Sequence, residues 1–220
     1  MTDKTKRQSQ STLANHQEEQ PKIGKQSQYG TYPKGYAWNG VTSISESPEG
    51  GEANPYYADN MKYFSIMSAE EFGGTIEAYY YPDEFMPCMG LEKIADGTYI
   101  NMQSKQSFGL AYKTKLGNDI VGSDFGYKLH LVYGVKVNPS ESSYETESDS
   151  PEPSAMSWDF DSTPVTVTGK KATSVCTIDS TKVAPAKMQQ LLDAIYGTDL
   201  LDGKLLTPDE VATIIGTIAG

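Results

Sequence analysis

The chain has 220 residues, a formal net charge of −11 at pH 7 and 15 tyrosines. Its length fits one domain with appendages and is sufficient to bury a core. A chain this acidic is not expected to bind nucleic-acid backbones by counterion release, because that mode of binding needs clustered Lys and Arg. The tyrosines favour pleated surfaces and subunit interfaces, so they suit a β-rich protein and also an assembling one.

Residues 1–28 are rich in Gln, Ser, Lys and Glu and offer almost nothing to bury. This composition predicts a disordered arm, or an arm that becomes ordered only on a neighbouring subunit. The first 20 residues contain no apolar stretch of the signal-peptide kind. The longest apolar stretch, near residues 211–219, is about half the ~20 residues of a membrane-spanning helix. We therefore expect a soluble protein made in the cytoplasm, with no membrane insertion.

Residues 29–183 contain short segments in which apolar and polar side chains alternate, a pattern typical of β-strands. The expected strands are residues 37–45, 62–66, 75–81, 106–114, 125–137, 155–161, 165–169 and 172–179. Two long connections interrupt them. Residues 46–60 contain Pro and Gly, and residues 138–154 are rich in Ser, Glu and Pro. Connections of this length inside a compact domain are usually functional or disordered.

The strand at residues 127–137 has the clearest alternation in the chain. One face would carry Tyr127, Leu129, Leu131, Tyr133, Val135 and Val137, and the other Lys128, His130, Val132, Gly134 and Lys136. At about 3.3 Å per residue the segment spans roughly 36 Å, whereas a usual strand spans about 17–20 Å. This length favours a large sheet or barrel, including one that continues beyond a single subunit.

Residues 184–220 have helical periodicity. Apolar side chains stand at i, i+3, i+4 and i+7, namely Met188, Leu191, Leu192 and Ile195. Pro185 precedes this helix and Gly197 follows it, as helix-start and helix-stop signals do. The sequence from Thr207 to Glu210 has the form of a capping box and predicts a second, short helix, which must dock on other elements to be stable.

Candidate catalytic and metal-binding groups are few. The only histidines are His16 and His130, and a lone strand histidine is usually a surface or core group. Cys88 and Cys176 lie far apart in apolar contexts, so they fit free thiols in a reducing compartment.

Two acid pairs, Asp83-Glu84 and Asp159/Asp161, would suit a glycosidic hydrolase if a cleft joined them. Acid pairs are common in any acidic chain, however, and no known catalytic motif accompanies them. We expect no enzymatic activity, no catalytic residue, no cofactor and no metal site.

Several short segments occur together in a specific order. They are YPDEF (81–85), KQSFGLAYKT (105–114), LGND (116–119), GYKLHLVYG (126–134), SPE (150–152), SW (157–158) followed by TPV (163–165), TIDST (177–181) and LTPDEV (206–211). In this order they resemble the major tail proteins, or tail tube proteins, of siphovirus phages. These phages have long non-contractile tails and infect Gram-positive bacteria. The similarity covers nearly the whole chain from Tyr29 onward.

The resemblance implies a mainly β fold with a flanking α-helix. Two packed β-sheets would form a sandwich-like barrel over residues 29–183, with extended loops, an N-terminal arm (1–28) and a C-terminal helical segment (184–220). It also implies homo-hexameric rings that stack into the tail tube of the virion, assembled in the cytoplasm of the bacterial host. The tube delivers DNA as transiting cargo. The other partners implied are the tape-measure, tail terminator and distal tail proteins.

We expect subunits to join through the open edges of residues 127–137 and their partner strands. The connection at 46–60 and the terminal segments are the candidates for clasping the next subunit or ring. The candidate interface residues are Tyr56, Tyr57, Tyr127, Leu129 and Tyr133. The alternative function is a carbohydrate- or receptor-binding β-sandwich of the virion, which would have a discrete pocket lined by aromatic side chains.

Overall fold

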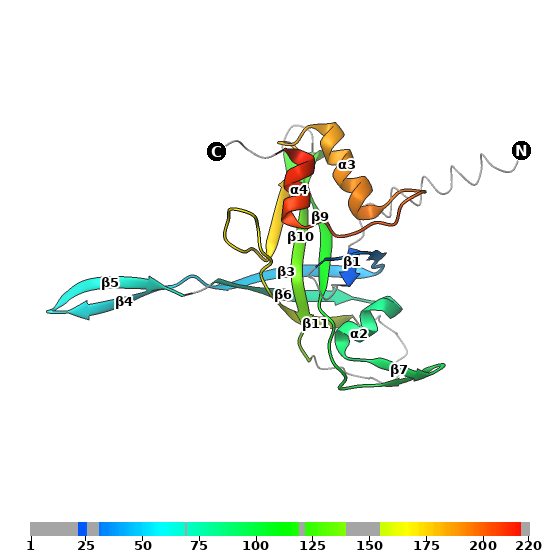
Figure 1. Ribbon diagram of the computed structural model, residues 1–220, viewed down its shortest axis with the longest axis horizontal. Helices are drawn as coiled ribbons and strands as arrows, with labels where there is room; N and C mark the ends of the chain where they lie inside the picture. Colours follow the sequence, from blue (N-terminus) through cyan, green and yellow to red (C-terminus); the bar gives the residue numbers. More distant parts are fainter. Residues whose placement is uncertain (1–21, 26–30, 69, 119–121, 140–154, 217–220) are drawn as a thin grey trace, which may run out of the picture.

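The computed structural model describes residues 22–25, 31–68, 70–118, 122–139 and 155–216 (Figure 1). These ranges contain an eight-stranded sheet, two separate β-hairpins and flanking helices. The expected mainly β fold with a flanking helix is therefore confirmed.

The large sheet is built from strands distributed over the whole chain. They are β1 (Lys22–Lys25), β2 (Gly35–Ala37), β3 (Val41–Gly50), β6 (Glu70–Ala78), β9 (Phe108–Asn118), β10 (Gly122–Val137), β11 (Met156–Ser162) and β12 (Val175–Asp179). Their order is β2-β1-β9-β10-β11-β6-β3, and β12 also pairs with β10. Every strand pair is antiparallel. In Figure 1 β3 and β6 run across β9 and β10, so one sheet supplies two layers.

The remaining elements lie around this sheet. The hairpins are β4 (Ala53–Ala58) with β5 (Met61–Met67), and β7 (Glu92–Ala95) with β8 (Thr98–Ile100). A 3₁₀ turn, η1 (Asp83–Phe85), leads into the short helix α2 (Met86–Met89). The two expected C-terminal helices are present as α3 (Pro185–Tyr196) and α4 (Pro208–Ile215), and α4 begins with the expected capping box at Thr207.

Strand β10 holds the two layers together because it changes partner along its length. One edge pairs with β9, whereas the other pairs first with β12, through residues 128–132, and then with β11, through residues 135–137. The register with β9 shifts between Val132 and Val135. At this bulge Gly134 has a φ of 59°. Its N–H donates to Tyr32 Oη at 2.8 Å, and its carbonyl accepts from the Thr163 N–H at 2.9 Å.

The bulge overturns the expected single alternation of residues 127–137. Leu129, Leu131 and Tyr133 face one core cluster, but Val135 and Val137 face the other. A bulge inserts one extra residue, so the side chains that follow it exchange faces. Val132, expected on the polar face, is also completely buried.

Two hydrophobic clusters form the core. The first lies between the layers and centres on Phe85, whose ring lies 4.4 Å from Trp38 and 5.4 Å from both Phe108 and Trp158, measured between centroids. The second lies between the β9–β10–β12 part of the sheet and the helices α3 and α4. There Tyr133 is completely buried and donates a hydrogen bond to the Leu206 carbonyl at 2.9 Å.

Three other expectations need correction. The connection at 46–60 is mostly strand, because β3 continues to Gly50 and β4 begins at Ala53. The arm at 1–28 contains β1, which lies between β2 and β9 within the sheet; residues 1–21 lie outside the described residues. Residues 165–169 form only an isolated bridge, between Val165 and Thr173. Most of the acidic connection, residues 140–154, is also outside the described ranges.

Candidate assembly surfaces

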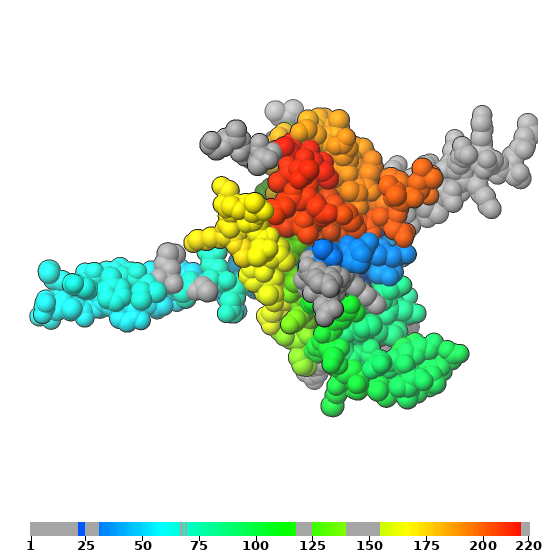
Figure 2. All heavy atoms as spheres, in the orientation of Figure 1, coloured from blue at the N-terminus to red at the C-terminus, as the bar shows by residue number. Residues whose placement is uncertain are grey.

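The β4–β5 hairpin extends away from the sheet as a separate arm (Figure 2). Cross-strand pairs join Tyr56 to Phe64 and Ala58 to Met61, leaving Asp59 and Asn60 as the turn. Both turn residues have positive φ, 51° and 59°. A two-residue hairpin turn of type I′ requires this conformation, and Asp and Asn tolerate it better than most residues. The local sequence therefore encodes the hairpin.

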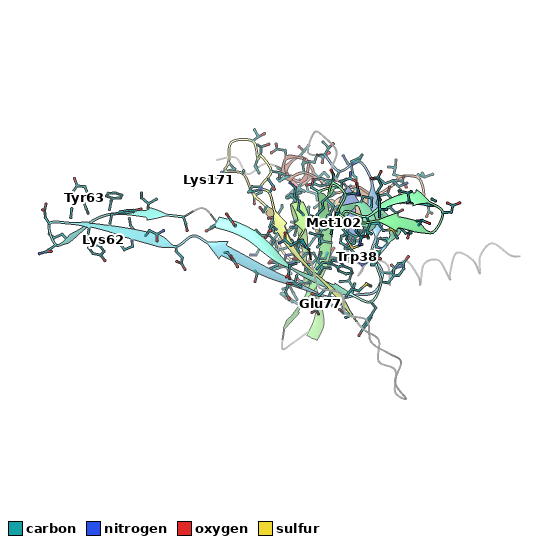
Figure 3. All side chains as sticks on the ribbon, turned by 90° about the horizontal axis from the view of Figure 1, so that it is seen from below. Trp38, Lys62, Tyr63, Glu77, Met102 and Lys171 are labelled. Carbon is teal, nitrogen blue, oxygen red and sulfur yellow. The ribbon has the colours of Figure 1, made fainter. Side chains whose placement is uncertain are left out.

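The hairpin exposes a set of large apolar side chains. Between 48% and 78% of each is accessible in Tyr56, Tyr57, Met61, Tyr63, Phe64 and Ile66. The rings of Tyr56 and Phe64 stack at 4.9 Å, and the ring of Tyr63 meets Phe64 edge-on at 6.0 Å. Figure 3 shows Tyr63 and Lys62 on opposite faces of the hairpin. We call this set of side chains the hairpin patch.

Two of the five expected interface residues, Tyr56 and Tyr57, belong to the hairpin patch. The sequence prediction missed Tyr63 and Phe64, although the expected strand at 62–66 contained both. The signal was the Asp-Asn pair between two aromatic segments, which is a hairpin pattern. The prolines and glycines of 46–60 favour an irregular loop and so obscure this hairpin pattern.

The other three expected interface residues lie on β10. Leu129 and Tyr133 are completely buried inside the monomer, so they cannot contact a neighbouring subunit and are withdrawn as interface residues. Tyr127 is half-buried, and the Lys113 ammonium lies 5.1 Å from its ring centroid. Residues 129, 131 and 133 pack against α3 and α4 of the same chain, whereas Val135 and Val137 face the other core cluster. Both edges of residues 128–132 are already paired, with β9 and β12.

A polar cluster connects β3, the strand that precedes the β4–β5 hairpin, with the body of the sheet. Glu46 lies on β3, and its Oε1 accepts a hydrogen bond from the hydroxyl of Tyr112 on β9. The rings of Tyr112 and His130 are parallel, with centroids 4.8 Å apart. His130 Nδ1 is 3.2 Å from Glu46 Oε1 but lacks hydrogen-bond alignment, whereas its Nε2 is 2.9 Å from Thr114 Oγ1. Glu46 thus links β3 to β9 and β10.

Burial determines the protonation of this cluster. It raises the pKa of Tyr112 well above the ordinary value, and the hydrogen bond to Glu46 acts in the same direction. Burial also lowers the pKa of His130 below its usual 6.5, assisted by Lys128 and opposed by Glu46. Both rings are therefore neutral at pH 7.

The second hairpin, β7–β8, forms one wall of a hollow of about 550 Å³, and η1 and α2 form the other. Apolar lining comes from Met86, Pro87, Leu91 and Tyr99, and Asp83, Glu92, Lys93, Gln103 and Ser104 add polar groups. Ile94 and Met102, which follow and precede the lining residues Lys93 and Gln103 in sequence, are also exposed. We call it the α2–β7 groove. It contains Asp83 of the first acid pair.

The second acid pair lines a different hollow, of about 560 Å³, near the base of the β4–β5 hairpin. Asp159 and Asp161 lie there with Glu49, Glu70 and Glu71. Asp159 Oδ1 accepts from Thr75 Oγ1 at 2.7 Å, and Asp161 Oδ2 accepts from Asn138 Nδ2 at 2.8 Å. These two hydrogen bonds occupy one oxygen of each carboxylate. Within the described ranges, no group of three or more His, Cys, Asp or Glu is arranged to hold a metal ion.

No protein-family model matches the chain, and no curated protein matches it. Among the residues that the structure describes, no helix has the length and apolar character needed to cross a bilayer. The geometry of the surfaces above is therefore the main basis for a functional conclusion, together with the sequence resemblance.

Proposed function

We propose that this chain is a non-enzymatic structural subunit of a phage tail tube, which assembles with copies of itself into stacked homo-hexameric rings. The hairpin patch is the observation that carries the proposal. Isolated two-stranded hairpins are at best marginally stable in water, and large exposed apolar patches mark interaction sites. β4 and β5 pair only with each other within the described ranges, so a partner would stabilise an arm that the monomer leaves solvated.

Open sheet edges provide a second line of support for self-assembly. β3 is a ten-residue strand at one end of the sheet order and pairs only with β6 among the described strands. A long unpaired edge is a template for a strand from another chain. The arm continues from this same strand, so an incoming copy would meet an edge and an apolar hairpin side by side. Head-to-tail contacts of this kind close into rings or extend into tubes.

The acidic hollow supports a role as a DNA conduit. Its five carboxylates, listed above, lie on one face of the molecule near the base of the arm. A wall of this charge repels phosphate over about one Debye length, ~8 Å at physiological salt, so transiting DNA would not adhere. In virions carrying Glu49→Lys and Glu71→Lys, DNA release should be slower although tubes still form. Equal release rates would remove this hollow from the proposed channel wall.

Assembly of the purified protein tests the proposal directly. Negative-stain microscopy and sedimentation velocity over a wide concentration range should show rings or tubes for the wild-type chain. A chain in which Gly-Ser-Gly replaces residues 53–67 should remain monomeric with its sheet intact, as judged by circular dichroism. A wild-type protein that is monodisperse and monomeric at every concentration would contradict the proposal. In the virion, the tape-measure, tail terminator and distal tail proteins would be the further partners.

The stacked, exposed pair Tyr56–Phe64 also suits the alternative function, a carbohydrate- or receptor-binding module of the virion, because exposed aromatic rings can stack on a ligand. This alternative predicts ligand binding by a monomer. Titration with glycans of the host cell wall, monitored by tyrosine fluorescence, separates the two functions. Saturable binding without assembly supports the alternative.

A further inference from the structure

The hairpin patch and the α2–β7 groove lie on opposite sides of the molecule. In Figure 1 and Figure 3 the β4–β5 arm extends in one direction, whereas β7–β8 extends in roughly the other. A projecting apolar element on one side and a hollow on the other are what a head-to-tail contact between identical chains requires. A two-fold contact would instead bring the same surface of both copies together.

The groove has the volume and the apolar lining to receive apolar side chains. The groove has a volume of about 550 Å³ and an apolar lining from Met86, Pro87, Leu91 and Tyr99. Sites of roughly 300–1,000 Å³ enclose drug-sized molecules, so this one has room for aromatic side chains at the tip of a hairpin. Tyr side chains suit such a site, because their rings bury apolar area while their hydroxyls bind polar groups.

Charge complementarity indicates which partner fills the groove. Lys62, near the tip of the hairpin, forms no ion pair with any described residue, and neither do the groove carboxylates Asp83 and Glu92. The groove lysine, Lys93, is already paired with Asp96 at 2.7 Å. Among the described residues the groove therefore presents two acids without an ion pair to Lys62, the one lysine of a hairpin whose turn also carries one acid, Asp59. Lys62 points away from Tyr63, so its long side chain can reach an acidic rim while the rings enter the groove.

We propose that the tip of the β4–β5 hairpin of one copy inserts into the α2–β7 groove of the next copy, with Lys62 of the hairpin paired to Asp83 and Glu92 of the groove. This inference rests on the proposed function and adds to it the surface that receives the arm. Each copy then donates one hairpin and receives one, which gives a chain of contacts that closes into a ring or continues along a tube.

Charge exchange tests the pairing. Lys62→Glu should raise the protein concentration needed for assembly about tenfold, because like charges then meet at the contact. The double variant Asp83→Lys, Glu92→Lys should weaken assembly similarly. The triple variant that combines these changes restores opposite charges and should assemble near the wild-type concentration. Lys171→Glu is the matched control, since Lys171 is exposed and belongs neither to the hairpin nor to the lining of the groove. Sedimentation velocity and microscopy are the readouts, and circular dichroism checks the fold.

Proximity is tested separately by mixing a Tyr63→Cys chain with a Tyr99→Cys chain under mild oxidation. A disulfide-linked pair containing one chain of each kind supports the insertion. If wild-type protein assembles but the triple variant is not restored and no mixed disulfide forms, the acceptor assignment is wrong and the self-assembly proposal stands. If wild-type protein does not assemble, both are overturned.

Discussion

The rings of Tyr56 and Phe64 stack across the β4–β5 hairpin, with centroids 4.9 Å apart and an angle of 17° between the ring planes. About half of each side chain is nevertheless exposed. The pair thus stabilises the hairpin and at the same time presents apolar surface to a partner. Neither residue belongs to a core cluster, so changing the pair should affect assembly more than the stability of the monomer.

Replacing both rings, in the variant Tyr56→Ser, Phe64→Ser, should therefore reduce assembly strongly while the monomer unfolds at nearly the same urea concentration. The sheet core does not depend on the hairpin, and exposed substitutions usually change stability by about 0.5 kcal/mol or less. Sedimentation velocity measures assembly, and urea denaturation measures stability. Tyr79→Ser is a suitable control, because Tyr79 is 51% exposed but lies outside the hairpin. If the Tyr56→Ser, Phe64→Ser variant assembled as well as the Tyr79→Ser control, the hairpin patch would be excluded as an interface.

Gly134→Ala should destabilise the fold by about 3 kcal/mol or more. A Cβ at this position would lie 2.3 Å from the Thr163 carbonyl oxygen, and φ is 59°. The control Gly169→Ala measures the cost of the positive φ alone, because φ there is 71° but a Cβ would have no neighbour within 4 Å. We expect that control to cost about 1–2 kcal/mol. Urea denaturation measures both, and similar losses would show that the bulge at β10 is not sterically restricted.

His130 should make stability depend on pH. Burial lowers its pKa below 6.5 in the folded protein, so the unfolded chain binds a proton first as the pH falls below that value. Protonation then favours unfolding, and the free energy of unfolding decreases between about pH 6.5 and the lower pKa of the folded state. His130→Gln removes this contribution. Urea denaturation of both proteins at a series of pH values should give curves that diverge in that window, whereas parallel curves would show that His130 titrates normally.

The capping box of α4 should contribute measurably to stability. The side chain of Thr207 accepts from the Glu210 N–H at 3.4 Å, and Glu210 Oε2 accepts from the Thr207 N–H at 2.8 Å. Thr207→Ala removes the first bond and should cost about 1 kcal/mol. Thr166→Ala, at an exposed threonine outside α4, should have little effect on thermal unfolding. If the two variants had the same unfolding temperature, the cap would not contribute to holding α4 against the second core cluster, which includes Leu206.

The local signals in the sequence predicted most elements well. Periodicity located β6, β9 to β12 and both C-terminal helices, because each has side chains that must alternate or repeat to be buried. β5 was also predicted, although its side chains are exposed in the hairpin. The prediction failed where a neighbour far along the chain decides the backbone. Gly134 adopts its bulge because Tyr32 and Thr163 bind it, and neither is close in sequence. The single alternation of residues 127–137 therefore could not reveal that its last two valines face another core.

The candidate interface was predicted in part for a similar reason. Exposed and buried apolar residues of strands look alike in sequence. Tyr56 and Tyr57 are an exposed pair of this kind, and Leu129 and Tyr133 are a buried pair. Only the packing of α3 and α4 against β10 separates them. Pro48 and Pro55 favour a loop, but prolines are tolerated on strands with a free edge, and Pro48 lies on the edge strand β3 and Pro55 on β4 of the hairpin.

The position of β1 has a consequence for how the protein emerges during synthesis. Lys22–Lys25 is made first, but its partner β9 ends only at Asn118, so one edge of β1 stays open while the intervening residues are translated. Removing residues 1–28 would uncover an edge of β9 in the finished protein and invite aggregation. A shortened chain that begins at Pro21 keeps this strand. It is therefore the better starting material for asking whether the first 20 residues affect stacking.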